Sequence, residues 1–132
     1  MNRWLFKTDP DIYSWNDLAS KKSETWDGVS NHLALKHLRS VKKGDEIFIY
    51  HTGDEKSVIG VAQAVSDPYT DKKINLAVID IAPVRTLKKP VPLSLIKTDP
   101  KLKSWELARL GRLSVMPVSD AQWNEVLRLS GS

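Results

Sequence analysis

The three histidines are the side chains best suited to metal binding or proton transfer, and their spacing does not favour a metal site. His32 and His37 are five residues apart, which places them on different faces of a helix rather than at the i, i+4 spacing of a metal-binding pair. His51 follows a hydrophobic run at the start of a glycine-containing loop. A polar contact in a pocket and an ordinary strand-end residue are equally good interpretations there.

The rest of the sequence gives no positive case for catalysis. It contains no cysteine, which excludes disulfides, thiolate metal sites and thiol nucleophiles. It also lacks a glycine-rich phosphate loop, a nucleophile elbow and a His–Glu zinc motif. Carboxylate pairs such as Asp54 with Glu55, or Asp9 with Asp11, are explained better as exposed turn residues than as an acid and a base. We therefore predict a protein without catalytic residues, metal or cofactor.

Trp26 is the aromatic residue whose sequence surroundings favour a binding role. The chain has five tryptophans but two phenylalanines. Trp123 lies in an apolar helical stripe, and packing is the better explanation for Trp4 and Trp15. Trp26 is instead surrounded by small, polar and turn-forming residues over 25–31, which predicts a loop. Aromatic residues on loops often line binding sites because loops on a rigid scaffold carry the binding groups.

Positive charge gathers in the second half of the chain. The formal net charge is +4, whereas residues 72–112 alone contain ten Lys or Arg against three Asp or Glu. Clustered basic charge favours a polyanionic partner, because released counterions stabilise such a complex whatever its sequence. A solvated basic face is an equally good interpretation on charge alone.

Hydrophobic periodicity and turn residues predict the elements that must position these side chains. The expected helices cover 14–20, 30–40, 104–110 and 120–129, and the expected strands cover 3–7, 46–51, 57–66 and 74–85. Ser14 and Ser119 each begin a capping box. Strands 46–51 and 57–66 are expected to pair antiparallel across a short loop. Three prolines predict an irregular segment over 83–95.

An α+β domain with a largely antiparallel, curled sheet follows from this pattern. The 132 residues fit one core, so we expect a single domain over 1–132. No apolar run approaches the ~20 residues of a membrane-spanning helix, and no signal-peptide core is visible at the start. These features predict an intracellular, cytoplasmic protein that does not cross a membrane.

One short segment occurs twice. Lys7-Thr8-Asp9-Pro10 recurs as Lys97-Thr98-Asp99-Pro100, and a Ser-Trp pair follows each copy at the same distance. The sequences that flank the two copies do not match. Repeated turn chemistry is therefore a better interpretation than a duplicated unit.

Several segments taken together resemble the EVE domain, a member of the PUA-like group. The matching segments, in order, are Trp4 to Ser14, Trp26 to Asn31, Lys43-Gly44-Asp45, Tyr50-His51, Val58 to Ala62 and Arg112 to Ser119. Thr8 and Asp9 stand where the family usually has Ser and Glu, which keeps a hydroxyl and a carboxylate. Ser30 stands where the family usually has an arginine, so one cation is missing beside the expected pocket.

The resemblance implies a PUA-like pseudo-barrel with packed helices that binds nucleic acid without catalysis. Such a domain would read one modified base, either a modified cytosine in DNA or a modified base in RNA, held outside its stack against an aromatic face. The alternative is a small-molecule or nucleotide-processing enzyme on the same scaffold, like some ASCH domains, because a fold does not determine a function.

The resemblance also implies a set of site residues. The expected base-binding pocket consists of Trp26, Lys7, Thr8, Asn31, Tyr50, His51, Ser114, Val115, Met116 and Pro117. On the separate ground of the basic charge over 72–112, the residues expected to bind phosphate are Arg85, Lys88 and Lys89. Trp26 would supply the stacking face, and the apolar part of 114–117 would contact a methyl group. That contact alone is worth only ~1 kcal/mol, so pocket geometry must supply the remaining selectivity.

Overall fold

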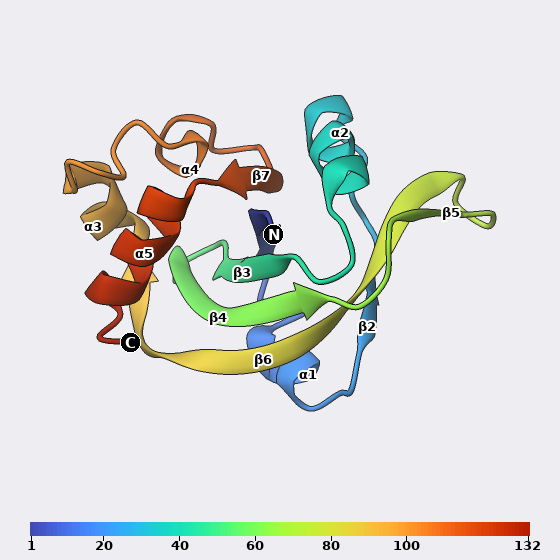
Figure 1. Cartoon of the computed structure of the whole chain (residues 1–132), viewed down its shortest axis with the longest axis horizontal. Helices are drawn as coiled ribbons and strands as arrows, with labels where there is room; N and C mark the ends of the chain where they lie inside the picture. Colours follow the sequence, from blue (N-terminus) through green and yellow to red (C-terminus); the bar gives the residue numbers. More distant parts are fainter.

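A curled mixed sheet carries the fold and brings distant segments of the chain together (Figure 1). The computed structural model describes residues 1–132. Its strands are β1 (Arg3–Thr8), β2 (Glu24–Trp26), β3 (Glu46–His51), β4 (Ser57–Ala64), β5 (Tyr69–Asp71), β6 (Leu76–Pro92) and β7 (Val115–Val118). The main path through the sheet is β2-β6-β4-β3-β1-β7, and β5 pairs with β6. Only β1 and β3 pair in parallel, so the predicted α+β class and the largely antiparallel sheet are confirmed.

Short helices cover the sheet at several places. They are α1 (Trp15–Ala19), α2 (His32–Ser40), α3 (Leu93–Thr98), α4 (Glu106–Arg109) and α5 (Asp120–Leu129). Figure 1 shows α3, α4 and α5 gathered at one end of the molecule, whereas α1 lies against β6. The predicted capping boxes at Ser14 and Ser119 are both formed. None of the helices is both long enough and apolar enough to cross a bilayer.

The prediction of an irregular segment over 83–95 was wrong. β6 continues to Pro92 and pairs with β4 over its second half, with register shifts between Val58 and Gly60 and between Val61 and Ala62. β2 and β5 pair with β6 only up to Ile81. Beyond that residue the edge of β6 that faces away from β4 has no neighbouring strand, so no backbone N–H is needed there as a donor. Prolines are tolerated at such an edge because their missing N–H breaks no ladder.

All five tryptophans are buried, and the indole groups of three of them are hydrogen-bonded. The Nε1 atoms of Trp4, Trp15 and Trp105 donate to Asp45 Oδ2, Thr86 Oγ1 and the Pro117 carbonyl, respectively, at 2.9 to 3.1 Å. The packing role predicted for Trp4 and Trp15 is therefore confirmed. Because these indole N–H groups have acceptors, tryptophan can be buried here without the cost of an unpaired donor.

Gly60 allows helix α1 to lie directly on the sheet. A Cβ atom added at this position would lie 2.6 Å from the Cε2 atom of Trp15. Because the indole ring already occupies that space, any larger residue on β4 would push α1 outward. The contact fixes the position of α1 and therefore the end of the turn over 9–14, which forms part of a cavity wall.

Candidate functional site

A cavity of about 500 Å³ opens where the end of β1 meets β2 and the turn after β1. This volume lies within the ~300–1,000 Å³ of pockets that take small ligands. Its walls are formed by Lys7, Thr8, Asp9, Ile12, Tyr13, Glu24, Thr25, Trp26, Asp27, Gly28, Val29 and Ser114. The lining combines two aromatic residues, a lysine and several carboxylates, which suits a flat ligand with a polar edge.

Hydrogen bonds within the turn after β1 fix the cavity wall. Asp9 Oδ1 accepts from the Asp11 amide at 2.9 Å, and the Asp9 carbonyl accepts from the amides of Ile12 and Tyr13 at 3.0 and 2.8 Å. The Thr8 hydroxyl donates to the Tyr13 carbonyl at 2.6 Å. Each of these bonds joins residues at most five apart in sequence, so local contacts define much of the shape of the turn.

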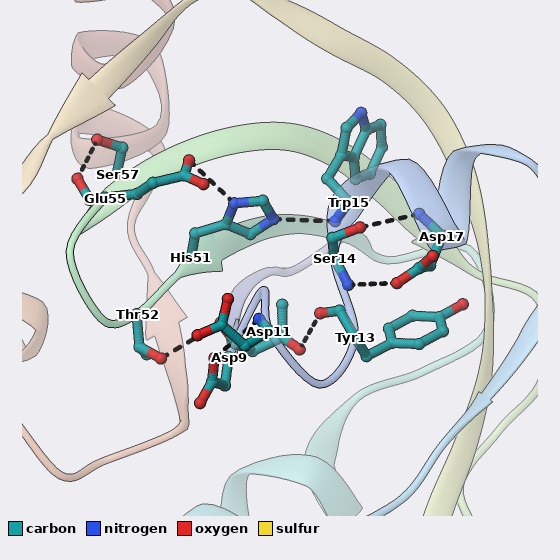
Figure 2. A network of polar contacts seen from close by, with 11 residues as sticks. Asp9, Asp11, Tyr13, Ser14, Trp15, Asp17, His51, Thr52, Glu55 and Ser57 are labelled. Carbon is teal, nitrogen blue, oxygen red and sulfur yellow. Dashed lines mark hydrogen bonds and ion pairs between the residues drawn. The ribbon is translucent and has the colours of Figure 1, made fainter.

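His51 anchors the other end of this turn at the start of α1. Its Nε2 atom accepts from the Trp15 amide at 2.9 Å, and its Nδ1 atom lies 3.1 Å from Glu55 Oε2 (Figure 2). Since Nε2 accepts from a backbone N–H, the ring is neutral and its proton is on Nδ1, where it donates to the carboxylate. The buried His51 therefore has both nitrogens occupied and does not line the cavity.

The polar groups of the cavity are coupled to one another. Tyr13 Oη donates to Glu24 Oε2 at 3.0 Å, and Lys21 Nζ lies 2.6 Å from the same oxygen. The hydrogen bond from Lys21 lowers the pKa of the Glu24 carboxyl, whereas burial and then Glu24 raise the pKa of Tyr13. Burial lowers the pKa of Lys7, whose Nζ donates to the Gly111 carbonyl at 3.0 Å. Tyr13 is thus a neutral hydroxyl beside a charged carboxylate.

Trp26 does not lie in a loop, contrary to the sequence prediction. It ends the three-residue strand β2, pairs with Ile79 of β6 and is 7% exposed. Its ring centroid lies 5.8 Å from that of Phe6 and 6.0 Å from that of Tyr13. These contacts make Trp26 part of the core as well as of the cavity wall. The half-buried Tyr13 is the more accessible aromatic side chain of the cavity.

The structure brings together part of the expected pocket. Lys7, Thr8, Trp26 and Ser114 line the cavity. The members that lie elsewhere are Asn31, Tyr50, His51, Val115, Met116 and Pro117. Asn31 caps α2, where its side chain accepts from the Leu33 and Ala34 amides.

Val115 and Met116 cannot form the apolar wall that was expected of them. They lie on β7, where they pair with Phe6 and Leu5 of β1, and both are fully buried. The sequence did not predict β7, because four residues with a proline among them give no readable alternation. Only Ser114, immediately before the strand, reaches the cavity.

The expected pocket did not include several residues that line the cavity, and the sequence indicates some of them better than others. Asp9, Ile12 and Tyr13 belong to the same matching segment as Lys7 and Thr8, so their proximity to those residues was a usable signal. Glu24 and Thr25 lie on β2, whose three residues carry no periodic pattern. Nothing in the local sequence connects them with β1.

The basic segment 72–112 does not form one patch. Lys72 and Lys73 lie at the turn between β5 and β6, whereas Lys97, Lys101 and Lys103 lie on or after α3 at the other end of the molecule (Figure 1). The expected phosphate-binding residues Arg85, Lys88 and Lys89 are exposed on the second half of β6 and do not line the cavity.

Comparisons with known proteins agree with this architecture. Mouse thymocyte nuclear protein 1 is 29% identical over 97% of this chain and 73% of its own length. A protein from Rhodopseudomonas palustris, solved by NMR, is 33% identical with a TM-score of 0.93 over 99% of this chain and 94% of its own. Human THYN1, solved in complex with 5-methylcytosine containing DNA, is 28% identical with a TM-score of 0.91 over 100% of this chain and 99% of its own.

Two further matches define the fold and the family. An ASCH protein from Zymomonas mobilis is 12% identical with a TM-score of 0.59 over 97% of this chain and 95% of its own, which shows a shared PUA-like fold and nothing more. The family model described as EVE domain matches residues 2–129, almost the whole chain. The protein therefore belongs to the EVE domain family.

Proposed function

We propose that this protein binds DNA that contains a modified cytosine and holds the modified base in the cavity between β1 and β2. The observation that carries the proposal is the similarity to human THYN1, which was solved with 5-methylcytosine containing DNA and shares the fold over the whole chain. No catalytic step is part of the proposal. The enzymatic alternative has the ASCH fold as its support, and a likeness at 12% identity carries no activity.

The chemistry of the cavity suits a base that has left its stack. Tyr13 offers an accessible aromatic face, and Trp26 backs it at right angles, with 80° between the ring planes. Stacking of a base on an aromatic side chain contributes ~1–3 kcal/mol. Tyr13, rather than Trp26 alone, is therefore the stacking partner in this proposal.

Polar side chains in the cavity match the hydrogen-bonding edge of cytosine. The exocyclic N4 amino group of cytosine is a donor, and carboxylates such as Glu24 or Asp27 accept from it. Lys7 and Ser114 supply donors for the ring nitrogen and carbonyl oxygen of the same edge, whereas the Thr8 hydroxyl already donates to the Tyr13 carbonyl. Thymine and uracil present a carbonyl at the position of N4, which would oppose a carboxylate.

The preference for a methyl group is expected to be moderate. Ile12 and Val29 are the aliphatic side chains of the cavity lining, and because Ile12 projects into solvent, the methyl contact is expected from Val29. Burial of one methyl group contributes ~0.8 kcal/mol, or about a fourfold difference in affinity. Arg85, Lys88 and Lys89 would hold the DNA backbone by charge in both cases and would not distinguish the two bases.

Binding assays with defined oligonucleotides test the proposal. Fluorescence anisotropy is measured with duplexes that differ only in one cytosine, 5-methylcytosine or thymine, at two salt concentrations. We expect tighter binding of 5-methylcytosine than of cytosine, with thymine weakest, and loss of this order in Tyr13→Ala. Equal affinity for all three duplexes would contradict the proposal. To test the enzymatic alternative, the protein is incubated with modified nucleosides and the mixture is separated by chromatography. A converted nucleoside would favour that alternative.

A further inference from the structure

Ile12 is more exposed than any other large apolar side chain of the protein. It is 83% exposed, whereas the only comparable residue is the terminal Met1 and the next, Val84, is 52% exposed. Single exposed apolar residues are ordinary on protein surfaces. Ile12 differs from them in its location, because it stands at the wall of the cavity proposed to take a base.

The repeated segment shows what the same turn does elsewhere in this protein. In the second copy, Asp99 Oδ1 accepts from the Lys101 amide, and the Asp99 carbonyl accepts from the amides of Leu102 and Lys103. These bonds reproduce, position by position, those that Asp9 makes. Leu102 is the counterpart of Ile12, and it is fully buried in the core. The turn therefore projects an apolar side chain for packing, and at Ile12 nothing in the chain packs on it.

The turn is built to keep Ile12 projecting outward. Its amide donates to the Asp9 carbonyl, the Thr8 hydroxyl holds the next residue, and α1 begins two residues later at a complete capping box. The turn is therefore ordered before any partner binds, so binding costs little further conformational entropy there. Asp9 and Asp11 are exposed beside it, and their negative charges disfavour contact with phosphates. The tip suits an apolar, uncharged surface such as the faces of stacked bases.

We propose that Ile12 is a wedge that enters a DNA duplex and fills the space left by the base that moves into the cavity. Apolar side chains inserted between base steps compensate part of the cost of unstacking, which is a few kcal/mol per step. This inference rests on the proposed function and extends it, since it makes duplex DNA the substrate. A single strand leaves no gap in a stack for the wedge to fill.

The test compares duplex and single-stranded DNA. Affinities of wild type, Ile12→Ser and the control Val84→Ser are measured for a 5-methylcytosine oligonucleotide, both alone and paired with its complement. 2-Aminopurine placed opposite the modified base reports unstacking by its fluorescence. Both mutated side chains are exposed, so both variants should keep the wild-type melting temperature.

We expect Ile12→Ser to bind the duplex about tenfold more weakly and to reduce the 2-aminopurine signal, with single-strand affinity and Val84→Ser unchanged. Equal weakening for duplex and single strand would overturn the wedge and make Ile12 a contact of the base itself. An unchanged duplex affinity would overturn it as well. Failure of the proposed function has a separate signature: wild type would show no preference for the modified base in either form of DNA.

Discussion

Two turns that share a Lys-Thr-Asp-Pro segment and a following Ser-Trp pair have different surroundings in this protein. The cavity turn, residues 7–15, comes at the end of a strand and opens onto the cavity. The second turn, residues 97–105, comes at the end of α3 and is called the buried turn because the side chains of Asp99, Leu102 and Trp105 are buried. Asp9 and Asp99 accept the same backbone hydrogen bonds. Asp9 is exposed, but Asp99 is buried within reach of Glu125 and Arg128. Local sequence therefore sets the shape of a turn, and the surrounding elements decide whether it becomes part of a site.

Matched truncations at the third residue after each aspartate should give the largest contrast. Leu102→Ala should destabilise the protein by ~2–5 kcal/mol, because it removes a fully buried side chain and leaves a cavity. Ile12→Ala should change the free energy of unfolding by less than ~0.5 kcal/mol, because its side chain is exposed. Urea unfolding measures both. Similar losses in the two variants would mean that the turns do not differ as described.

The comparison also shows which features of the fold can be predicted from the local sequence. The capping serines and the Asp-Pro turns depend on neighbours a few residues away, and the strand 46–51 pairs with the next strand along the chain, so their patterns were readable. β2, β7 and the course of β6 beyond Ile81 depend on strands far along the chain. Trp26 was assigned to a loop for this reason, since only its partner Ile79 makes it a strand residue.

The candidate site was predicted only in part, because strand pairing also decides which side chains face the cavity. Lys7 and Thr8 were identified within a matching segment and do line the cavity, whereas Val115 and Met116 were placed on its wall without knowledge of their strand. In a β-strand, adjacent side chains point to opposite faces, and both faces of β7 are covered. Sequence order alone could not supply that information.

His51 offers a smaller but more specific effect on the cavity turn. His51→Phe removes the acceptor of the Trp15 amide and should cost ~1–3 kcal/mol, the penalty for a buried N–H without a partner. Affinity for 5-methylcytosine DNA should fall too, because the turn loses one anchor. His51→Gln retains an acceptor and a donor and should recover much of both. If glutamine proved as harmful as phenylalanine, the hydrogen bond would not be what His51 contributes.

Neutralising the basic residues of β6 should leave the cavity untouched. Arg85→Gln, Lys88→Gln and Lys89→Gln together should weaken binding to every duplex alike and reduce the slope of log affinity against log salt by ~0.9 per lost phosphate contact. The ratio of affinities for 5-methylcytosine and cytosine should not change. A wild-type salt slope in this triple variant would place the phosphate contacts on other residues, and the cations of 97–112 would be the next to change.

The smallest effect concerns acid and belongs to the buried turn. Hydrogen bonds from Arg128 and then Asp99 lower the pKa of Glu125 from its ordinary 4.5 to about 2. A carboxyl with a lowered folded-state pKa stabilises the fold above its unfolded value, and that contribution is lost as the pH falls from about 4.5 to about 2. Burial raises the pKa of Asp99, which acts in the opposite sense.

Glu125→Gln should therefore flatten the loss of stability over this acidic range, as measured by urea unfolding at a series of pH values. Its affinity for DNA at neutral pH should equal that of wild type, since Glu125 does not line the cavity. A stability profile identical to that of wild type would show that the Glu125–Arg128 pair makes no pH-dependent contribution.

NMR titration of the folded protein with a 5-methylcytosine duplex tests the central claim most directly, because it reports both turns in one experiment. The account predicts large amide shift changes in the cavity turn and β2, at residues 7–13 and 24–29, and none in the buried turn at 99–103. A matched cytosine duplex should shift the same resonances less at equal concentration. Shift changes confined to the buried turn and α5, or binding that leaves the cavity resonances unmoved, would contradict the assignment of the cavity as the base-binding site.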